Sequence, residues 1–358
     1  MISYDVTSFG QPLERIERVT PTPKGREVLL KVVAAGVCHT DLHTWEGSYD
    51  LGSGKRLKMA DRGVKLPLTL GHEIVGEVVS AGPDAPALTP GQRKIIYPWI
   101  GCGTCKVCAR DQENLCAAPR FLGVFASGGY SDHVVVPDAK YLVDIGDLTP
   151  EQAAPYACSG LTTFSAIKKI HPDVLTQEPV VVIGAGGVGL MCITLLRAMG
   201  CNKVIVVETN GARRGAALAA GADAAIDGAA EDAVAQVSAA ANGGAWAVID
   251  CVGSAATVNQ GIAMLVKGGQ LIIIGLFGGE TTLSTALLPM RAISLEGSYI
   301  GNLPELQALM ALVRDKRPLA IPITCRCLSE APEALQALEA GTVVGRLILQ
   351  PQKKEHTA

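Results

Sequence analysis

The ten-residue sequence VVVIGAGGVG at positions 180–189 decides the fold. Its four β-branched residues indicate a buried strand, and the glycines that follow open an apolar helix that ends at Gly200. A second β-branched run at 204–207 ends at Glu208. A strand, a glycine-rich turn, a helix and an acidic residue about twenty positions further on are typical of a dinucleotide-binding βαβ unit.

Each part of this motif predicts a contact with a dinucleotide. Glycines let the backbone approach a pyrophosphate at the helix N-terminus, and a carboxylate can accept hydrogen bonds from a ribose diol. We therefore expect cofactor contacts from Gly184, Gly186, Gly187, Val188, Gly189 and Glu208. The alternative, glycines that only make a tight turn, is weaker because a strand precedes them and a helix follows.

The pattern along the chain changes near residue 150. β-Branched runs at 27–34, 74–79, 93–97 and 130–136, separated by turn signals, predict a compact, partly closed β domain. Thr149-Pro150-Glu151 is typical of a helix start. The pattern is βαβ from there on, so the fold class is α/β, with further parallel strands expected at 247–252 and 270–276 and short helices in the alanine-rich segment 212–241.

A dense group of polar residues, CHTDLH at 38–43, follows an apolar run. His72 and Glu73 stand at the mouth of the next expected strand, and Cys158 adds a second thiol. A lone cysteine would more often be a buried small hydrophobe. Two thiolates and one imidazole with a free fourth position, however, form the ligand set of an open catalytic zinc site. We expect Cys38, His72 and Cys158 to be its ligands.

Four further cysteines, Cys102, Cys105, Cys108 and Cys116, fall in a segment rich in glycine and polar residues. Four thiolates hold zinc in a closed tetrahedral site that stabilises a loop without a core of its own. An iron–sulfur cluster is the alternative, but its usual run has three residues before the fourth cysteine and a proline directly after it. Here seven residues precede Cys116 and Ala117 follows it, so structural zinc is favoured.

Composition limits the classes of function. A length of 358 residues suggests two domains, and a net charge of −3 gives no basic footprint for nucleic acid or an anionic membrane. The uncharged segment 179–196 is long enough to span a membrane, but its glycines favour a buried βα unit. Only 18% of the residues are charged, which agrees with a homo-oligomer. The N-terminus has no secretory pattern, and we expect a cytoplasmic protein.

These residues resemble the zinc-dependent medium-chain alcohol dehydrogenases, particularly the yeast and bacterial type, whose Cys-His-Thr-Asp-Leu-His signature stands at 38–43. The resemblance covers almost the whole chain. It implies a GroES-like catalytic β domain from residues 1–158 and 300–358, and a Rossmann domain with a doubly wound parallel sheet from residues 159–299.

The resemblance also implies roles for single residues. Cys38, His72 and Cys158 match the ligands of the catalytic zinc, Cys102, Cys105, Cys108 and Cys116 match those of the structural zinc, and Glu73 matches an acid that can approach the metal. Asp41 matches the carboxylate that orients His72. Thr40 and His43 match a proton relay, His39 and Arg346 match pyrophosphate contacts, and Thr162 matches a residue beside the nicotinamide. We expect Thr40, Trp45 and Trp99 to line the substrate pocket.

The implied activity is hydride transfer between an alcohol, held as a zinc-bound alkoxide, and NAD, giving an aldehyde or a ketone reversibly. Two zinc ions per chain, a small-molecule substrate and a tetramer rather than a dimer are expected. Alternatives are a glutathione-dependent formaldehyde dehydrogenase, or a polyol dehydrogenase, although polyol dehydrogenases carry Glu where this chain has Cys158. A non-catalytic nucleotide-sensing protein is the alternative from another class.

Two departures from the family pattern stand out. Glu208 replaces the usual Asp, and Arg213 and Arg214 follow closely, so NADP is an alternative to NAD. Residues 46–65 form a longer segment than in the yeast-type enzymes. We expect residues 49–65 to shape substrate access, because both ends lie close in sequence to His43 and His72. A subunit interface is the alternative.

Overall fold

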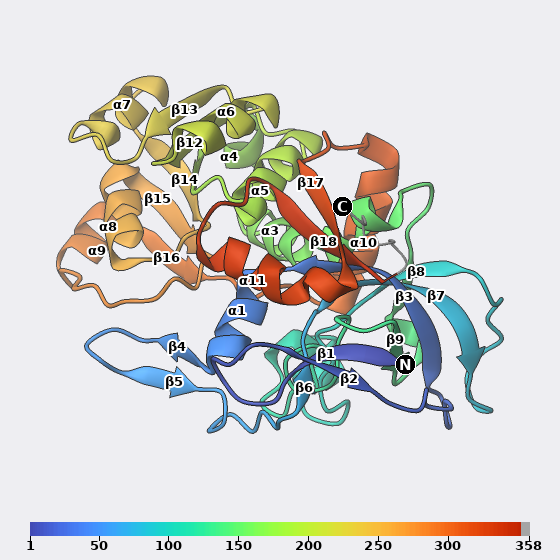
Figure 1. Cartoon of the computed structure of the whole chain (residues 1–358). Helices are drawn as coiled ribbons and strands as arrows, with labels where there is room; N and C mark the ends of the chain where they lie inside the picture. Colours follow the sequence, from blue (N-terminus) through green and yellow to red (C-terminus); the bar gives the residue numbers. More distant parts are fainter. Residues whose placement is uncertain (352–358) are drawn as a thin grey trace.

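The computed structural model describes residues 1–351 (Figure 1). Figure 1 shows the parallel sheet and its helices in the upper left and the N-terminal strands in the lower part, with the C-terminal elements between them. Within residues 1–351, every helix is too short or too polar to cross a membrane.

The dinucleotide motif lies in a six-stranded parallel sheet with the order β13-β12-β11-β14-β15-β16. Its strands are β11 (Pro179–Ile183), β12 (Lys203–Glu208), β13 (Ala224–Asp227), β14 (Ala245–Asp250), β15 (Leu265–Ile273) and β16 (Ser294–Gly297). The strand order reverses between β11 and β14, and such a switch point opens a crevice at the carboxyl ends of the strands. Gly184, directly after β11, therefore lies at this crevice.

Two helices precede the first strand of the parallel sheet, and the others connect its strands. They are α3 (Ser159–Ile167), α4 (Pro172–Gln177), α5 (Gly187–Ala198), α6 (Gly211–Ala219), α7 (Ala233–Ala240), α8 (Ala255–Met264) and α9 (Leu287–Arg291). The helices expected in the alanine-rich segment are α6 and α7. The expected helices are confirmed, and strand β13 between them was not predicted. Its sequence, AAID, has one β-branched residue and gives little strand signal.

Cys38 and His72 flank strands of a second, mixed sheet with the order β10-β8-β7-β3-β18-β17 and with β9 beside β3. Its strands are β3 (Val28–Val37), β7 (Glu73–Ala81), β8 (Arg93–Ile96), β9 (His133–Val136), β10 (Leu142–Asp144), β17 (Ile323–Cys327) and β18 (Arg346–Gln350). Leu347 on β18 pairs with Val37 on β3. The C-terminal segment therefore returns to the N-terminal sheet. The exact domain boundaries stay a prediction.

Smaller elements complete the half of the molecule that contains the mixed sheet. A three-stranded sheet has the order β2 (Glu14–Glu17), β1 (Ile2–Val6) and β6 (Leu68–Thr69). A separate hairpin consists of β4 (Ser48–Asp50) and β5 (Arg56–Lys58). The other helices are α1 (His39–Glu46), α2 (Pro150–Ala153), α10 (Leu303–Lys316) and α11 (Ala331–Glu339). Thr149 and Gln152 cap the start of α2 reciprocally, as the helix-start signal predicted.

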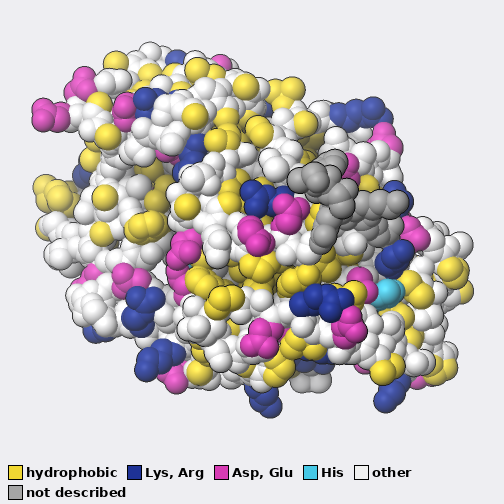
Figure 2. Space-filling model, in the orientation of Figure 1, with side chains coloured by type: hydrophobic (Ala, Val, Ile, Leu, Met, Phe, Trp, Pro, Cys, Tyr) yellow, Lys and Arg dark blue, Asp and Glu magenta, His cyan; other side chains and the backbone are white. Residues whose placement is uncertain are grey.

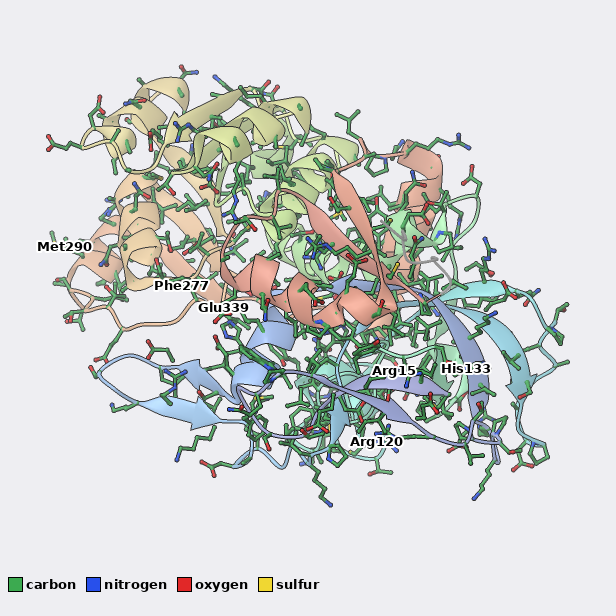
Figure 3. The ribbon with its side chains drawn as sticks, viewed as in Figure 1. Arg15, Arg120, His133, Phe277, Met290 and Glu339 are labelled. Atoms are coloured by element: carbon green, nitrogen blue, oxygen red, sulfur yellow. The ribbon has the colours of Figure 1, made fainter. Side chains whose placement is uncertain are left out.

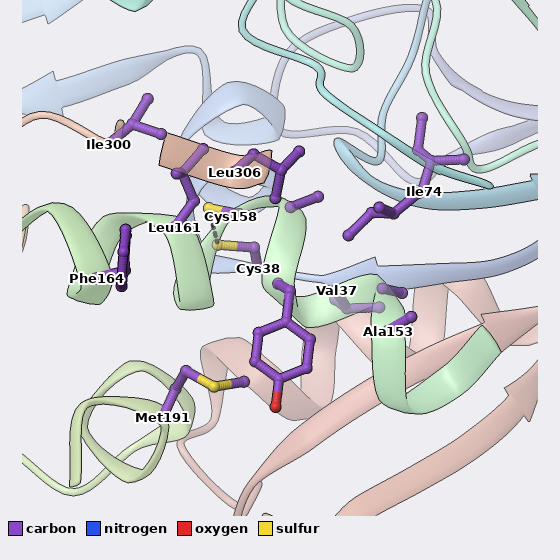
Figure 4. Packing of buried hydrophobic residues seen from close by; sticks show 14 of the residues in the cluster. Val37, Cys38, Ile74, Ala153, Cys158, Leu161, Phe164, Met191, Ile300 and Leu306 are labelled. Carbon is purple, nitrogen blue, oxygen red and sulfur yellow. Dashed lines mark hydrogen bonds between the residues drawn. The ribbon is translucent and has the colours of Figure 1, made fainter. Parts of the chain in front are cut away.

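One cluster of buried apolar residues joins the two sheets through α3 and α5. Figure 4 shows Cys38 and Cys158 facing each other within it, beside Leu161 and Ile300. Charged ligands in such surroundings interact strongly, because little water is present to screen them. On the outside, Figure 2 shows Lys and Arg interspersed with Asp and Glu, in agreement with the small net charge.

Candidate active site

The expected catalytic ligands come together where β3, β7 and α3 meet. Cys38 is the N-cap of α1, directly after β3, and Cys158 is the N-cap of α3. His72 precedes β7, and Glu73 is the first residue of that strand. One ligand atom from each of Cys38, His72, Glu73 and Cys158 lies within 4.8 Å of all the others, and all four residues are buried.

A glycine in β3 makes room for this arrangement. Gly36 pairs with Glu73 across the sheet, and a Cβ atom at position 36 would lie 2.0 Å from Glu73 Oε2. Any other residue at position 36 would displace the carboxylate. Glu73 instead forms a buried ion pair with Arg346 from β18, so the C-terminal strand neutralises the acid beside the ligands. The sequence did not predict this pair.

Asp41 orients His72. The Nδ1 atom of His72 lies 3.1 Å from Asp41 Oδ1, and the same carboxylate accepts hydrogen bonds from the backbone N–H groups of Cys38 (2.9 Å) and Gly71 (3.0 Å). The hydroxyl of Tyr130 donates to its other oxygen at 3.3 Å. The opposite ring nitrogen of His72, Nε2, is buried and has no hydrogen-bond partner among residues 1–351. A metal ion would satisfy that nitrogen, so the ring is arranged as a ligand.

The two thiols also fit a metal. Cys38 Sγ and Cys158 Sγ are 4.0 Å apart. Their hydrogen bond lowers the pKa of Cys38 well below the usual thiol value, whereas this bond and burial raise the pKa of Cys158. Two adjacent buried thiols do not both ionise without a compensating cation. Zinc takes thiolate and neutral imidazole ligands, and the donor set Cys38, His72 and Cys158 fits it.

The four-cysteine segment forms a second cluster. The Sγ atoms of Cys102, Cys105, Cys108 and Cys116 all lie within 4.8 Å of one another, and separations of 3.4, 3.7 and 3.9 Å occur among them. Sulfurs on a tetrahedron with Zn–S bonds of about 2.3 Å would be about 3.8 Å apart. The segment contains only the short 3₁₀ helices η1 (Cys108–Arg110) and η2 (Glu113–Leu115). A metal fits here in the place of a hydrophobic core.

The glycine-rich loop forms a close backbone turn between β11 and α5. Gly184 has a positive φ of 89°, and a Cβ atom at Gly189 would lie 1.9 Å from the Gly184 carbonyl oxygen. The Glu208 carboxylate at the end of β12 accepts from the backbone N–H groups of Ala185 and Asn210, both at 2.8 Å. The loop, the N-terminus of α5 and this acid have the chemistry that a dinucleotide requires.

Comparison with known proteins agrees with this geometry. Residues 24–147 match the alcohol dehydrogenase GroES-like domain, and residues 187–315 match the zinc-binding dehydrogenase domain. An NAD-dependent alcohol dehydrogenase of Sulfurisphaera tokodaii is 36% identical over 353 residues, which cover 98% of this chain and 100% of that protein. The chain belongs to the zinc-type medium-chain alcohol dehydrogenase family.

Other members of the family are similar over the same length. An NAD-dependent alcohol dehydrogenase of Saccharolobus solfataricus is 35% identical and covers 98% of this chain and 100% of its own. The crystal structure of an alcohol dehydrogenase from Aeropyrum pernix superposes with a TM-score of 0.88 at 30% identity, over 98% of this chain and 100% of that one. The GroES-like and Rossmann-like architecture expected from the sequence is therefore confirmed.

Within this family fold, α1 carries five of the expected residues: His39, Thr40, Asp41, His43 and Trp45. His43 Nδ1 lies 3.3 Å from Glu46 Oε2, and its ring centroid lies 4.7 Å from that of Tyr49. Thr162 is on α3, one turn after Cys158. The backbone N–H of Thr162 donates to the Cys158 carbonyl oxygen at 2.8 Å.

The two expected tryptophans differ in surroundings. Trp99 is 1% exposed, donates to the Ala157 carbonyl at 2.9 Å and has its ring 5.1 Å from that of His72. Trp45 is half-buried and donates to the Gln11 carbonyl at 2.6 Å. The structure thus brings Trp99 beside an expected metal ligand, whereas the Trp45 indole N–H is hydrogen-bonded to the N-terminal segment.

Two expected cofactor residues outside the glycine loop, Arg213 and Arg346, are also held by contacts. Arg213 donates to the carbonyls of Gly341 (2.7 Å) and Val343 (3.3 Å). Arg346 packs against the glycine-rich loop, because a Cβ atom at Gly187 would lie 2.6 Å from Arg346 Cδ. Arg346 therefore lies between the Glu73 carboxylate and the loop that would hold a pyrophosphate.

Two contributions to the site had no signal in the sequence. Tyr130 reaches Asp41 from 89 residues away, and only the fold brings them together. The β4–β5 hairpin contacts the loop after β15, where a Cβ atom at Gly278 would lie 2.5 Å from the Asp50 carbonyl oxygen.

Proposed function

We propose that this protein is an NAD-dependent zinc alcohol dehydrogenase that converts an alcohol reversibly into an aldehyde or ketone. The observation that carries the proposal is the buried Nε2 of His72, which has no hydrogen-bond partner in the described part of the chain and lies beside two thiols, next to a dinucleotide-binding crevice. Three ligands leave the fourth zinc position free for a substrate. Formation of NADH from NAD and an alcohol tests the proposal, and a protein that binds NAD without turnover would contradict it.

The residues have distinct tasks in this reaction. When bound, zinc polarises an alcohol oxygen and lowers its pKa, and NAD accepts a hydride. Cys38, His72 and Cys158 would hold the catalytic zinc, and the four-cysteine segment a structural one. Asp41 keeps the proton of His72 on Nδ1, which leaves Nε2 free to bind the metal. The rings of Trp99 and Phe121, 5.3 Å apart, exclude water on one side.

Thr40 and His43 support a path by which the alcohol proton leaves a dry site. Thr40 precedes His43 by less than one helical turn, and the His43 side chain is 17% exposed beside Glu46. A hydroxyl at Thr40 can pass a proton outward, and the His43 imidazole can accept it near the surface.

His43→Gln is expected to slow alcohol oxidation mainly at the acidic end of the pH profile, where solvent base is scarce, by about tenfold or more. Values of kcat across pH measure this. His171→Gln is the control, because His171 is exposed and lies outside the site. A His43→Gln profile that matches wild type would show that the relay is bypassed.

Glu208 supports NAD as the cofactor, because a carboxylate binds a ribose diol and repels a 2′-phosphate. Glu208→Gln is therefore expected to raise KM for NAD by about tenfold, the value of one charge-assisted hydrogen bond, and to improve the use of NADP. Steady-state kinetics with both cofactors measure the change. Glu231→Gln removes an exposed carboxylate from the same half of the chain and serves as control. Equal efficiency of the native enzyme with NAD and NADP would contradict the assignment.

The β4–β5 hairpin supports a role in substrate access. It follows α1, and its Gly52 packs so closely on the 278–280 loop that a Cβ atom would lie 2.4 Å from Glu280 Cβ. The N–H of Gly278 in turn donates to the Gly253 carbonyl at 3.1 Å, beside the carboxyl end of β14. The hairpin therefore bridges the catalytic half and the cofactor crevice.

Replacing residues 50–57 with a short Gly-Ser linker is expected to shift kcat/KM between small and bulky alcohols by about tenfold, a usual effect of altered pocket contacts. The buried Met59 stays in place, which protects the fold. Zinc content and NAD affinity are the controls and should not change. An unchanged substrate range with a dissociated oligomer would assign the hairpin to a subunit interface instead.

The surface supports a homo-oligomer, and we favour a tetramer. Phe277 (73% exposed) and Met290 (68%) lie on the same side of the molecule in Figure 3, beside β16 at the edge of the parallel sheet. Exposed apolar patches of this kind mark subunit contacts. Light scattering measures the assembly, and a monomer would contradict it.

The cysteines support a cytoplasmic location, because all eleven are free thiols. Cell fractionation checks this location.

A further inference from the structure

The imidazole of His43 is contacted both by its own helix and by the β4–β5 hairpin, which follows α1 directly (Figure 1). Nδ1 of His43 lies 3.3 Å from Oε2 of Glu46, three residues later on α1. The ring of Tyr49, on β4, packs on the imidazole, with the ring centroids 4.7 Å apart and the planes tilted by 44°. Two side chains from different elements therefore fix the position of this ring.

Glu46 determines which nitrogen of the ring can take up a proton. An ionised carboxylate only accepts hydrogen bonds, so Nδ1 of the neutral ring carries the hydrogen and Nε2 keeps its lone pair. A carboxylate in this position also faces the positive charge that the ring gains when Nε2 is protonated. Asp41 and His72 have the same arrangement, although Nε2 of His72 is there for a metal ion.

Tyr49 contributes packing and not a second base. Burial raises the pKa of the Tyr49 phenol above its usual range, so the phenol stays neutral at the pH of the reaction. Tyr49 pairs with Leu57 across the hairpin, and the neighbouring Ser48 hydroxyl accepts from Arg56 Nε at 2.8 Å. Packed aromatic rings attract each other beyond their burial, so Tyr49 restricts rotation of the imidazole.

The backbone after α1 brings Tyr49 back towards His43. Gly47 ends the helix in the left-handed conformation, with a φ of 83°, and its N–H donates to the His43 carbonyl at 3.0 Å. A Cβ atom at position 47 would lie 2.6 Å from Cγ of Phe9, so only glycine fits this turn. The Gly47 carbonyl in turn accepts from the N–H of Met59 at 2.8 Å, which anchors the hairpin to the helix end.

The His43 pair differs from a histidine–carboxylate pair elsewhere on the surface. The His43 and Glu46 side chains are 17% and 33% exposed, whereas those of His171 and Asp173, 3.7 Å apart, are 71% and 76% exposed. His43 is therefore mostly enclosed but still reaches water, and a proton taken up by the ring can leave to the solvent.

We propose that Glu46 and Tyr49 are positioning residues for the proton relay, which hold the His43 imidazole with Nε2 available and act only through that ring. The inference rests on the relay proposed above for alcohol oxidation. The alcohol loses its O–H proton, Thr40 passes one proton on, and Nε2 of His43 accepts it. The imidazolium then releases this proton to water, so the neutral ring is restored in each turnover.

A double-mutant cycle tests this dependence on His43. Values of kcat are measured with NAD and one alcohol, at the acidic pH where His43→Gln is slowest relative to wild type. Glu46→Ala should lower kcat by about fivefold, the value of one hydrogen bond, and Tyr49→Leu should lower it by about threefold, the value of one aromatic contact. In a His43→Gln background neither change should lower kcat further, because both act through the missing ring.

The controls separate positioning from a general structural role. Tyr49→Phe keeps the ring and should restore most of the kcat that Tyr49→Leu loses. A bulky tertiary-amine buffer, added at constant pH and ionic strength, should raise the kcat of Glu46→Ala and Tyr49→Leu, because it supplies an external base. Asp173→Ala removes the carboxylate beside His171 and should leave kcat unchanged. Glu46→Ala is partly exposed, which keeps the test valid if Tyr49→Leu folds poorly.

Two results would overturn the inference. One is an equal loss of kcat in the wild-type and His43→Gln backgrounds, and the other is a normal kcat for Glu46→Ala and Tyr49→Leu beside a slow His43→Gln. A His43→Gln enzyme with normal kcat would instead reject the relay, and with it this inference. NADH formation by the wild type would still uphold the dehydrogenase activity, so these failures are distinguishable.

Discussion

A Cys158→Ser variant is expected to lose turnover and about one zinc ion per chain while the fold persists. Cys158 is one of three proposed ligands, and a serine hydroxyl is a poor substitute for a thiolate at zinc. Loss of residues that only support metal ligands already costs about 10- to 100-fold, so removal of a ligand should exceed that range.

The fold should survive because Cys158 lies within a large apolar cluster that does not depend on the metal. Metal analysis, circular dichroism and kcat are measured on the same preparation. Cys201→Ser is the matched control, since Cys201 is equally buried but lies in neither cysteine cluster. A Cys158→Ser protein that keeps two zinc ions and its activity would contradict the ligand assignment.

Cys105→Ser should act in the opposite way, by destabilising the protein. The lobe that carries Cys105 has only two short 3₁₀ helices, and its sulfurs would hold it together through the metal. Structural zinc in small domains contributes roughly 10 kcal/mol or more of apparent binding free energy, comparable with the whole stability of a domain. We expect Tm to fall by about 10 °C or more, because a loss of several kcal/mol of unfolding free energy shifts Tm by about that amount.

Thermal unfolding with and without a chelator measures this effect. The chelator should lower the Tm of wild type toward that of Cys105→Ser, and should change the variant much less. Lys106→Gln, at the neighbouring exposed position, is the control for a surface change in the same loop. Iron with sulfide in the purified protein, or an unchanged Tm for Cys105→Ser, would contradict a structural zinc site.

Much of the site was predictable because its chemistry is local in sequence. The CHTDLH run fixes Cys38 and Asp41 on either side of a helix start, and the four cysteines fall within fifteen residues. The glycine loop is equally local, since one strand, one turn and one helix define it. Short-range patterns of this kind are visible without any knowledge of tertiary structure.

The long-range contacts were not predictable from pattern alone. The return of β18 to β3 was expected only from the family resemblance, because strand pairing over such a separation has no periodic signal. The Glu73–Arg346 ion pair depends on that return. The Tyr130 contact with Asp41 and the hairpin contact with Gly278 likewise require the folded chain. Strand β13 was missed for the separate reason that its sequence, AAID, has a single β-branched residue.

The most direct test of the central claim is NADH formation from NAD and a panel of primary, secondary, aromatic and terpenoid alcohols, followed before and after removal of the catalytic zinc. We expect at least one class of alcohol to be oxidised, the activity to disappear when the catalytic zinc is removed, and the activity to return when zinc is restored. NADH formation that survives loss of this zinc, or NAD binding without oxidation of any alcohol, would contradict the account.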